Sequence, residues 1–202
     1  MPAKPVYNRN LWTLTVLCLL RERPMHPYEM RQLIAQRHKG EFLDLKPGSL
    51  YHAVQRLLTV HMILIQHISR PSRRPERTVY AITAAGEREL LSHLHDLLAA
   101  PSADGRGFFA GLSFIAHLTA AAAADALAER AATLRARIEG LTHALDALTP
   151  QLGRVLLLEN EYARDAFAAE LRWVQQVQED LRAGRLAWSY PSPAVPHTEA
   201  LS

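Results

Sequence analysis

The most informative segment of this 202-residue chain is Leu45-Lys46-Pro47-Gly48-Ser49-Leu50-Tyr51-His52-Ala53-Val54-Gln55-Arg56-Leu57. Pro47 suits the first turn of a helix, because its φ angle is already close to the helical value. Apolar side chains then recur at positions 50, 54, 57 and 58, a helical spacing that gives one inward-packing face. The other face carries the hydrogen-bonding groups of Ser49, His52, Gln55 and Arg56, with Tyr51 near its edge. We therefore expect a short helix with one buried face and one polar face.

Two more helices are expected before this segment. Residues 10–20 are almost continuously apolar, which predicts a mostly buried helix that ends before Pro24. A second helix should run from Pro27 to about Arg37, because proline is well tolerated in a first helical turn. Its apolar face would consist of Tyr28, Met30, Leu33 and Ile34.

Two strands are expected after the third helix, at residues 62–68 and 77–82, where apolar and β-branched side chains dominate. The linker between them, Ser69–Glu76, holds two prolines and three arginines and predicts a basic hairpin tip. Three helices, a strand, a basic loop and a second strand make a winged helix-turn-helix. The fold class is therefore mainly α, with a two-stranded wing.

The second half of the chain is expected to be helical. Thr83 should cap a fourth helix, which has leucines at positions 90, 91, 94, 97 and 98, and Pro101–Gly107 should end it. We expect a winged helix-turn-helix domain at residues 1–100 and a helical domain at 101–188. Prolines in residues 189–202 predict a disordered tail.

Three helices are expected in the C-terminal half, at about 108–118, 119–148 and 151–183, and Pro150 should make the last two an antiparallel hairpin. Apolar positions of the long helix recur in heptads: Leu127, Ala131, Leu134, Ile138, Leu141, Leu145 and Leu148. The last helix has an apolar face made of Val155, Leu158, Tyr162, Ala166, Ala169, Trp173, Val177 and Leu181. The heptad seam could pack inside one chain, between two copies, or both.

Three segments resemble the PadR family of transcriptional regulators. They are Arg23-Pro24-Met25-His26-Pro27-Tyr28-Glu29-Met30, the segment 45–57 quoted above, and Tyr80-Ala81-Ile82-Thr83-Ala84-Ala85-Gly86. The resemblance covers about residues 11–95. The C-terminal half resembles the long helical dimerisation domain of one PadR subgroup. The resemblance implies a homodimer that usually represses genes, often in response to small aromatic or lipophilic compounds or to stress.

The chain departs from the PadR pattern at two places. Pro27 stands where the family commonly has glycine, and Thr59 and His61 stand where it favours Glu and Gly. If His61 lies in a turn with positive φ, its side chain adds some strain there.

Charge is divided unevenly along the chain. Residues 1–80 hold 13 Lys+Arg against 5 Asp+Glu, a net charge of +8, and residues 81–202 hold 10 against 15, a net charge of −5. A basic half attached to an acidic half indicates that the first half meets a polyanion. Together with the fold, this points to double-stranded DNA as the partner.

The DNA contacts are expected from the third helix and the wing. Gln55 can bond adenine and Arg56 guanine, whereas Lys46 and Ser49 at the helix start suit a phosphate. Tyr51 and His52 could contact phosphate or a thymine methyl group. The wing would add Arg70, Arg73, Arg74 and Arg77. Alternatively, Tyr51 could belong to the core, His52 could simply face solvent, and Arg56 could pair with a glutamate.

Homodimerisation would place two winged helices on a pseudo-palindromic operator. The residues expected at the dimer interface are Leu127, Leu134, Ile138, Leu141, Leu145, Trp173 and Val177. A small-molecule effector could enter near aromatic side chains of the helical half: Phe108, Phe109, Phe114, Phe167 and Trp173. These rings could equally be ordinary core residues.

Several classes of protein are not indicated. The sequence has no catalytic motif, no metal-binding spacing and no cofactor-binding glycine loop, so we expect neither an enzyme nor a cofactor. Cys18, the only cysteine, lies in an apolar run that is shorter than a membrane span, and no signal peptide is visible. We expect a cytoplasmic protein without membrane contact. The alternative function is a winged helix that binds an acidic protein partner instead of DNA.

Overall fold

The computed structural model describes residues 9–37, 49–69, 77–101 and 105–188. They divide into two compact units. The first unit holds the described residues up to Leu94 together with Leu112–His117, and the second holds those of His95–Gly111 and Leu118–Trp188. The tail expected at 189–202 lies outside the described residues, and the division into domains at 1–100 and 101–188 stays a prediction.

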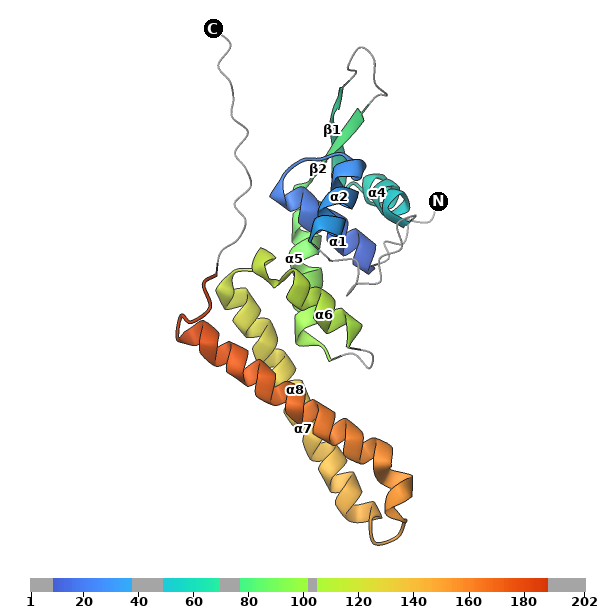
Figure 1. The fold of residues 1–202 in the computed structure, drawn as a ribbon, viewed down its shortest axis with the longest axis vertical. Helices are drawn as coiled ribbons and strands as arrows, with labels where there is room; N and C mark the ends of the chain where they lie inside the picture. The colour runs from blue at the N-terminus through green and yellow to red at the C-terminus, as the bar shows by residue number, and fades with distance from the viewer. Residues whose placement is uncertain (1–8, 38–48, 70–76, 102–104, 189–202) are drawn as a thin grey trace. The chain divides into compact units, whose positions relative to one another are not determined.

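The first unit is a winged helix, as the sequence predicts (Figure 1). Its described elements are α1 (Leu11–Glu22), α2 (Pro27–Gln36), α4 (Ser49–Thr59), β1 (Ile63–Ser69), β2 (Arg77–Ile82) and the start of α5 (Ala84–Ala99). Helix α1 packs against both α4 and β2, which is why every residue from Thr13 to Leu20 is buried. The lone thiol of Cys18 lies in this core, with an exposed fraction of 0%.

Both of the first two helices begin at a capping box. The side-chain oxygen of Asn10 accepts a hydrogen bond from the amide of Thr13 at 3.0 Å, and the Thr13 hydroxyl oxygen accepts one from the amide of Asn10 at 3.1 Å. In α2, Nδ1 of His26 accepts from the amide of Tyr28 at 3.0 Å, and Glu29 accepts from the amide of His26 at 3.0 Å. These bonds satisfy amides that a helix N-terminus would otherwise leave without partners.

Helix α4 ends in a Schellman motif. The amide of Met62 donates to the carbonyl of Leu57 at 3.0 Å, and the amide of His61 donates to the carbonyl of Leu58 at 3.0 Å. His61 has a φ of 57°, so it occupies the left-handed position where glycine is common. The positive φ considered from the sequence is therefore confirmed.

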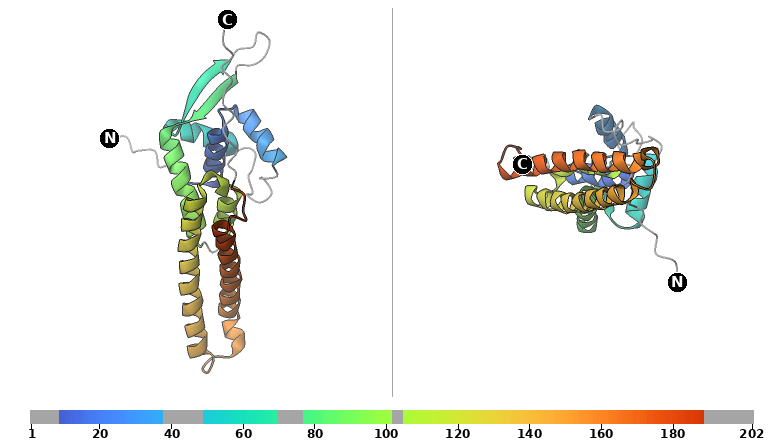
Figure 2. Two further views of the ribbon diagram at one scale, coloured as in Figure 1. Left: turned by 90° about the vertical axis from the view of Figure 1, so that its left-hand side faces the viewer. Right: turned by 90° about the horizontal axis from the view of Figure 1, so that it is seen from below.

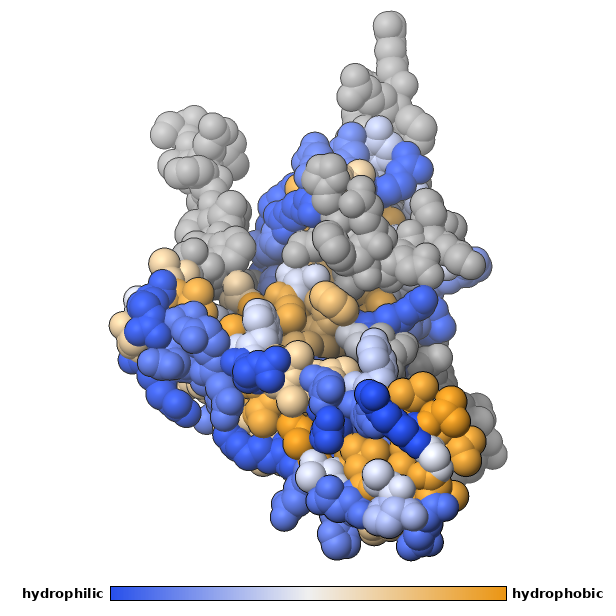
Figure 3. Space-filling model, turned by 60° about the horizontal axis from the view of Figure 1, so that its bottom comes forward, coloured by the Kyte–Doolittle hydropathy of each residue, from blue (hydrophilic) through white to orange (hydrophobic). Residues whose placement is uncertain are grey.

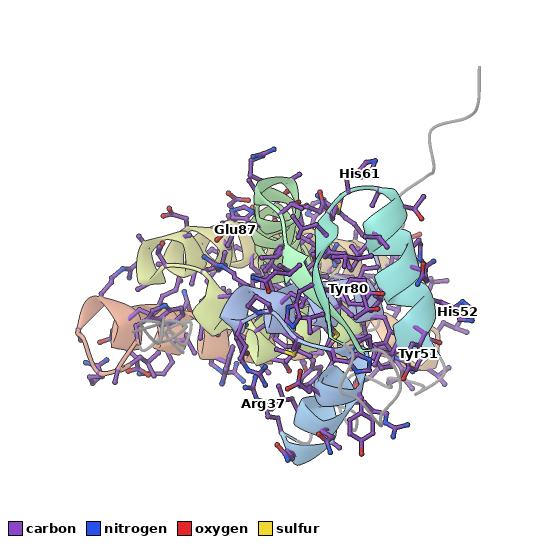
Figure 4. All side chains as sticks on the ribbon, turned by 90° about the horizontal axis from the view of Figure 1, so that it is seen from above. Arg37, Tyr51, His52, His61, Tyr80 and Glu87 are labelled. Carbon is purple, nitrogen blue, oxygen red and sulfur yellow. The ribbon has the colours of Figure 1, made fainter. Side chains whose placement is uncertain are left out.

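The wing is an antiparallel pair in which Ile63 lies opposite Ile82 and Ile65 opposite Tyr80. A bulge between Ile65 and His67 shifts the register before His67 pairs with Val79. Tyr80 also forms a bridge to Met25, with hydrogen bonds of 3.1 and 3.2 Å, so the segment before α2 extends the sheet at its edge. Figure 4 shows the Tyr80 ring within the unit rather than on its surface, in agreement with its exposed fraction of 7%.

The long helices of the second unit are α7 (Ala120–Leu148) and α8 (Leu158–Arg182), which pack side by side as the expected antiparallel hairpin (Figure 2). The last helix starts later than predicted, because Gly153 is extended and precedes a short 3₁₀ turn, η2 (Arg154–Leu157). The helix expected at 108–118 is also shorter: α6 (Arg106–Ser113) is followed by a 3₁₀ turn, η1 (Ile115–His117).

Candidate nucleic-acid interface

Helix α4 presents one buried face and one exposed face. Leu50, Ala53, Val54 and Leu57 are buried, whereas Tyr51, His52 and Gln55 are exposed. Tyr51 has an exposed fraction of 52%, which excludes the alternative that it is a core residue within this chain. Figure 4 shows Tyr51 and His52 projecting outward from α4. A helix of 11 residues is about 16 Å long, which fits the major groove of DNA.

Arg56 differs from its neighbours on α4 because its side chain is half-buried. Its Nε is buried without a hydrogen-bond partner. Among the described residues no carboxylate forms an ion pair with Arg56, so the glutamate partner considered from the sequence is not found there. Its guanidinium is therefore not held by another side chain in the described part of the first unit.

The remaining residues of the expected DNA interface lie at the edge of the described structure or outside it. Ser49 is half-buried at the first position of α4. Arg77 begins β2. Lys46, Arg70, Arg73 and Arg74 lie outside the described residues. The structure thus brings Ser49, Tyr51, His52, Gln55 and Arg56 together on one helix.

Tyr28 is an exposed residue of α2 that sequence reasoning assigned to an apolar face. That assignment was wrong: Tyr28 has an exposed fraction of 45%, whereas Pro27, Met30 and Ile34 point inward. The Arg31 guanidinium carbon lies 5.3 Å from the centre of the Tyr28 ring. A signal was available, because positions 27, 30 and 34 follow helical spacing and position 28 does not share their face. The pair adds a hydroxyl and a cation to the exposed surface of the first unit.

A network of charged side chains fixes the C-terminal ends of α1 and α2. Glu22 accepts two hydrogen bonds from the Arg37 guanidinium, at 2.6 and 2.7 Å, and Nε2 of His117 lies 4.0 Å from the same carboxylate. The hydrogen bond with Glu22 raises the pKa of Arg37 above its ordinary value. Arg21 pairs with Glu87 at 3.0 Å and donates to the carbonyl of His117. Arg37 follows the last residue of α2, so this network ties the C-terminal end of α2 to that of α1.

The residues expected at a dimer interface occupy different environments. Leu127, Leu134 and Leu145 are buried inside the second unit of a single chain, with exposed fractions of 0%, 0% and 5%. Ile138, Leu141 and Val177 are half-buried. Among the seven, Trp173 has the most exposed side chain, with an exposed fraction of 47%. The heptad seam thus forms the core of the chain's own hairpin, which leaves Leu127, Leu134 and Leu145 little surface for a partner.

The residues expected around an effector also occupy different environments. Phe108 and Trp173 meet edge to face, with ring centres 5.9 Å apart. Phe109 is 59% exposed, and Phe167 lies under the Arg137 guanidinium at 5.4 Å. Phe114 belongs to the first unit, where its ring centre is 6.1 Å from that of His117. Phe108 and Trp173 are therefore the two predicted rings that the structure brings into contact.

Two findings concern other kinds of site, and both are limited to the described residues. No group of three or more His, Cys, Asp or Glu side chains there has an arrangement that could hold a metal ion. No helix in the same part of the chain has the length and apolar character needed to cross a membrane.

The first unit has the architecture of a winged helix-turn-helix protein, with a polar recognition-type helix and a wing. Residues 16–92 match the model of the transcriptional regulator PadR-like family. Through this segment, the chain is similar to the PadR-like transcriptional regulators, as the sequence motifs indicate. No curated protein matches the chain.

Several solved structures are similar to this chain. Bacillus subtilis PadR in complex with operator DNA is 18% identical, with a TM-score of 0.39 over 85% of this chain and 99% of the other. The same protein in complex with p-coumaric acid is 18% identical, with a TM-score of 0.36 over 86% and 99%. A PadR-like regulator from Bacillus cereus is 16% identical, with a TM-score of 0.37 over 86% and 99%. The likeness to the PadR-like family rests on the match of residues 16–92 and not on these structural similarities.

Proposed function

We propose that this protein is a homodimeric, DNA-binding transcriptional repressor. The observation that carries the proposal is the exposed face of α4, where Tyr51, His52 and Gln55 project from a helix whose opposite face is buried. Imidazole, amide and phenol groups suit base edges and phosphates, and the net charge of +8 over residues 1–80 favours a polyanion. Such a regulator would work in the cytoplasm of a bacterium.

The first experiment is binding of the purified protein to its own upstream DNA across a salt series. A protein with six to ten phosphate contacts should lose about 10³- to 10⁵-fold in affinity between about 50 and 200 mM salt. His52→Ala and Gln55→Ala should each weaken binding to the selected site by about 1–3 kcal/mol. His143→Ala is the matched control, because His143 is an exposed histidine on α7.

A failure to bind that DNA, and to select any sequence from a random pool, would reject the DNA-binding proposal. Capture of an acidic protein through the same face would then support the alternative assembly function. Equal losses of DNA affinity in His52→Ala and in the His143→Ala control would show that α4 is not the recognition helix.

We propose that the dimer forms through the exposed apolar side of α8 and of the turn before it. Five large apolar side chains lie there within eleven residues: Leu152, Val155, Leu156, Leu158 and Tyr162, with exposed fractions of 39%, 73%, 61%, 48% and 78%. Figure 3 shows apolar side chains gathered on the side of the molecule that is turned forward. Exposed apolar patches on a soluble protein commonly mark an interface.

We also propose that a small aromatic effector relieves DNA binding. The support is the contact between the buried Phe108 and the half-exposed Trp173, together with the p-coumaric acid complex of Bacillus subtilis PadR. Titration of the protein with aromatic acids, followed by tryptophan fluorescence, tests this step. Trp173→Phe should remove most of the fluorescence change if the ligand binds there. Trp12 lies on α1 of the first unit, so Trp12→Phe should keep the fluorescence change.

A further inference from the structure

Arg130 of α7 is the only Lys, Arg, Asp or Glu side chain among the described residues that is buried. Its exposed fraction is 1%, and it lies in the second unit. Removing a guanidinium from water is costly unless it is paired and its donors are satisfied. Partners that offset the cost of burying the Arg130 guanidinium should therefore lie around it.

The partners of Arg130 come from three neighbouring elements of the second unit. Nε donates to the carboxylate of Glu170 on α8 at 2.5 Å. Nη1 donates to two backbone carbonyls at the end of α5, that of Leu98 at 3.3 Å and that of Ala100 at 3.0 Å. The guanidinium carbon lies 3.7 Å from the centre of the Phe108 ring on α6. Burial lowers the pKa of Arg130, and the hydrogen bond with Glu170 opposes this effect.

The backbone acceptors are the carbonyls that a helix leaves without partners at its C-terminus. Helix α5 ends at Ala99, and it is followed by Ala100 and Pro101 rather than by a glycine that could turn the chain back on these carbonyls. Arg137, two turns beyond Arg130 on α7, donates to the carbonyl of Pro101 at 3.2 Å. Two cations from α7 thus cap the negative end of the α5 dipole.

The other end of α5 is tied to the wing. Thr83, between β2 and α5, donates from its hydroxyl to the carbonyl of Met62 at 3.0 Å. The α5 helix is therefore held at its start by the base of the wing and at its end by Arg130. A helix is a rigid element that can carry a change from one end to the other.

We propose that Arg130 and Glu170 form a latch that holds the last turn of α5 on the hairpin and couples the position of α8 to the DNA-binding unit. This inference rests on the proposed DNA-binding function. Glu170 lies on α8, which carries the proposed dimer surface, so a movement of α8 also moves this carboxylate. The Glu170 side chain is 29% exposed, so a competing cation can also reach it. Loss of Glu170 leaves Arg130 buried without its counter-charge, and the last turn of α5 is then released.

The test uses the full-length chain in three forms: wild type, Glu170→Gln and Glu161→Gln. Glu170→Gln keeps the shape of the side chain and removes its charge. Glu161→Gln is the matched control, because Glu161 also lies on α8 and its pair with Arg154 of η2, at 2.9 Å, does not involve α5. A double variant, Arg130→Met/Glu170→Gln, removes the buried charge altogether. It therefore allows the test even if Glu170→Gln alone fails to fold because Arg130 is left without its counter-charge.

Two readouts separate the latch from a merely stabilising ion pair. Hydrogen–deuterium exchange of the amides at 95–100 should become about tenfold faster in Glu170→Gln and in the double variant, and unchanged in the control. DNA affinity, measured on folded dimer at one salt concentration, should fall by roughly 5- to 150-fold in the same two variants, the usual size of coupling between two sites.

Each outcome decides a different step. Unchanged exchange at 95–100 would overturn the latch. Faster exchange with wild-type DNA affinity would overturn the coupling and leave a structural cap. If the wild-type protein binds no DNA, the proposed function and the coupling fall together, while the exchange experiment still decides whether Arg130 and Glu170 hold α5.

Discussion

Gly86 lies so close to Met62 that a β-carbon built on the glycine would stand 2.1 Å from the Met62 carbonyl oxygen. The same β-carbon would lie 3.0 Å from Cγ1 of Ile82. The Thr83 hydroxyl fills the space beside them, because it accepts from the amide of Gly86 at 3.1 Å and donates to the Met62 carbonyl at 3.0 Å. The first turn of α5 therefore packs directly against Met62, which lies between α4 and β1 of the wing. This contact is the physical reason for a Thr-x-x-Gly sequence at this point.

Gly86→Ala should therefore destabilise the protein by about 1–3 kcal/mol, because the added methyl group overlaps backbone that cannot rotate away. Urea unfolding followed by circular dichroism measures the change. The control is Gly140→Ala on α7, where nothing lies within 4 Å of a β-carbon and a gain of about 0.5–1 kcal/mol is expected. Similar effects at both positions would contradict the close approach at Gly86.

His61 is the second backbone position with a specific requirement. Because its φ is 57°, replacement by glycine should remove strain and stabilise the first unit by up to about 1 kcal/mol. His61→Val should destabilise it by more than about 1 kcal/mol, since a β-branched side chain tolerates this conformation poorly. Thermal unfolding of the two variants gives opposite shifts if the Schellman motif at the end of α4 is correct. A lower melting temperature for His61→Gly would speak against it.

The winged helix could be predicted from the sequence because each of its elements has its own local signal. The proline that starts α2, the apolar spacing of α4 and the two apolar runs of the wing all indicate the elements that the structure contains. Local patterns agree with tertiary structure here, so each segment indicates the same fold.

The second half of the chain was less predictable for a physical reason. Helical periodicity shows that α8 has an apolar side but not which partner covers it. The pattern grouped Val155, Tyr162 and Trp173 on one face, whereas the hairpin buries Val174 and leaves those three exposed. Arg130 gave no sequence signal either, because an arginine on a long helix is usually solvated. Its role depends on Glu170, forty residues away, and on the carbonyls at the end of α5.

Tyr80 should make stability depend on alkaline pH. Burial raises the pKa of its phenol, so the folded protein holds this proton more tightly than the unfolded chain. The free energy of unfolding should then fall as pH rises above about 10, where the unfolded tyrosine loses its proton first. Urea unfolding between about pH 9 and 11 measures this slope. Tyr80→Phe should have a shallower slope, and an identical slope in both proteins would rule out a contribution from Tyr80.

The exposed apolar side of α8 provides the test of dimerisation. Tyr162 is 78% exposed in the single chain, so Tyr162→Glu should leave the fold of the hairpin intact. If this side chain is covered by a second copy, the new carboxylate is buried without a partner, which should weaken self-association by about 2–5 kcal/mol. Sedimentation equilibrium measures the association constant directly.

Gln175→Glu is the matched control for Tyr162→Glu. Gln175 is exposed on the same helix, but thirteen residues at about 100° each turn it roughly 140° away from Tyr162. It should keep the wild-type association constant. DNA affinity should follow the dimer, because a monomer holds only half of a two-fold operator. A Tyr162→Glu protein that still sediments as a dimer would move the interface away from this side of α8, whatever its affinity for DNA.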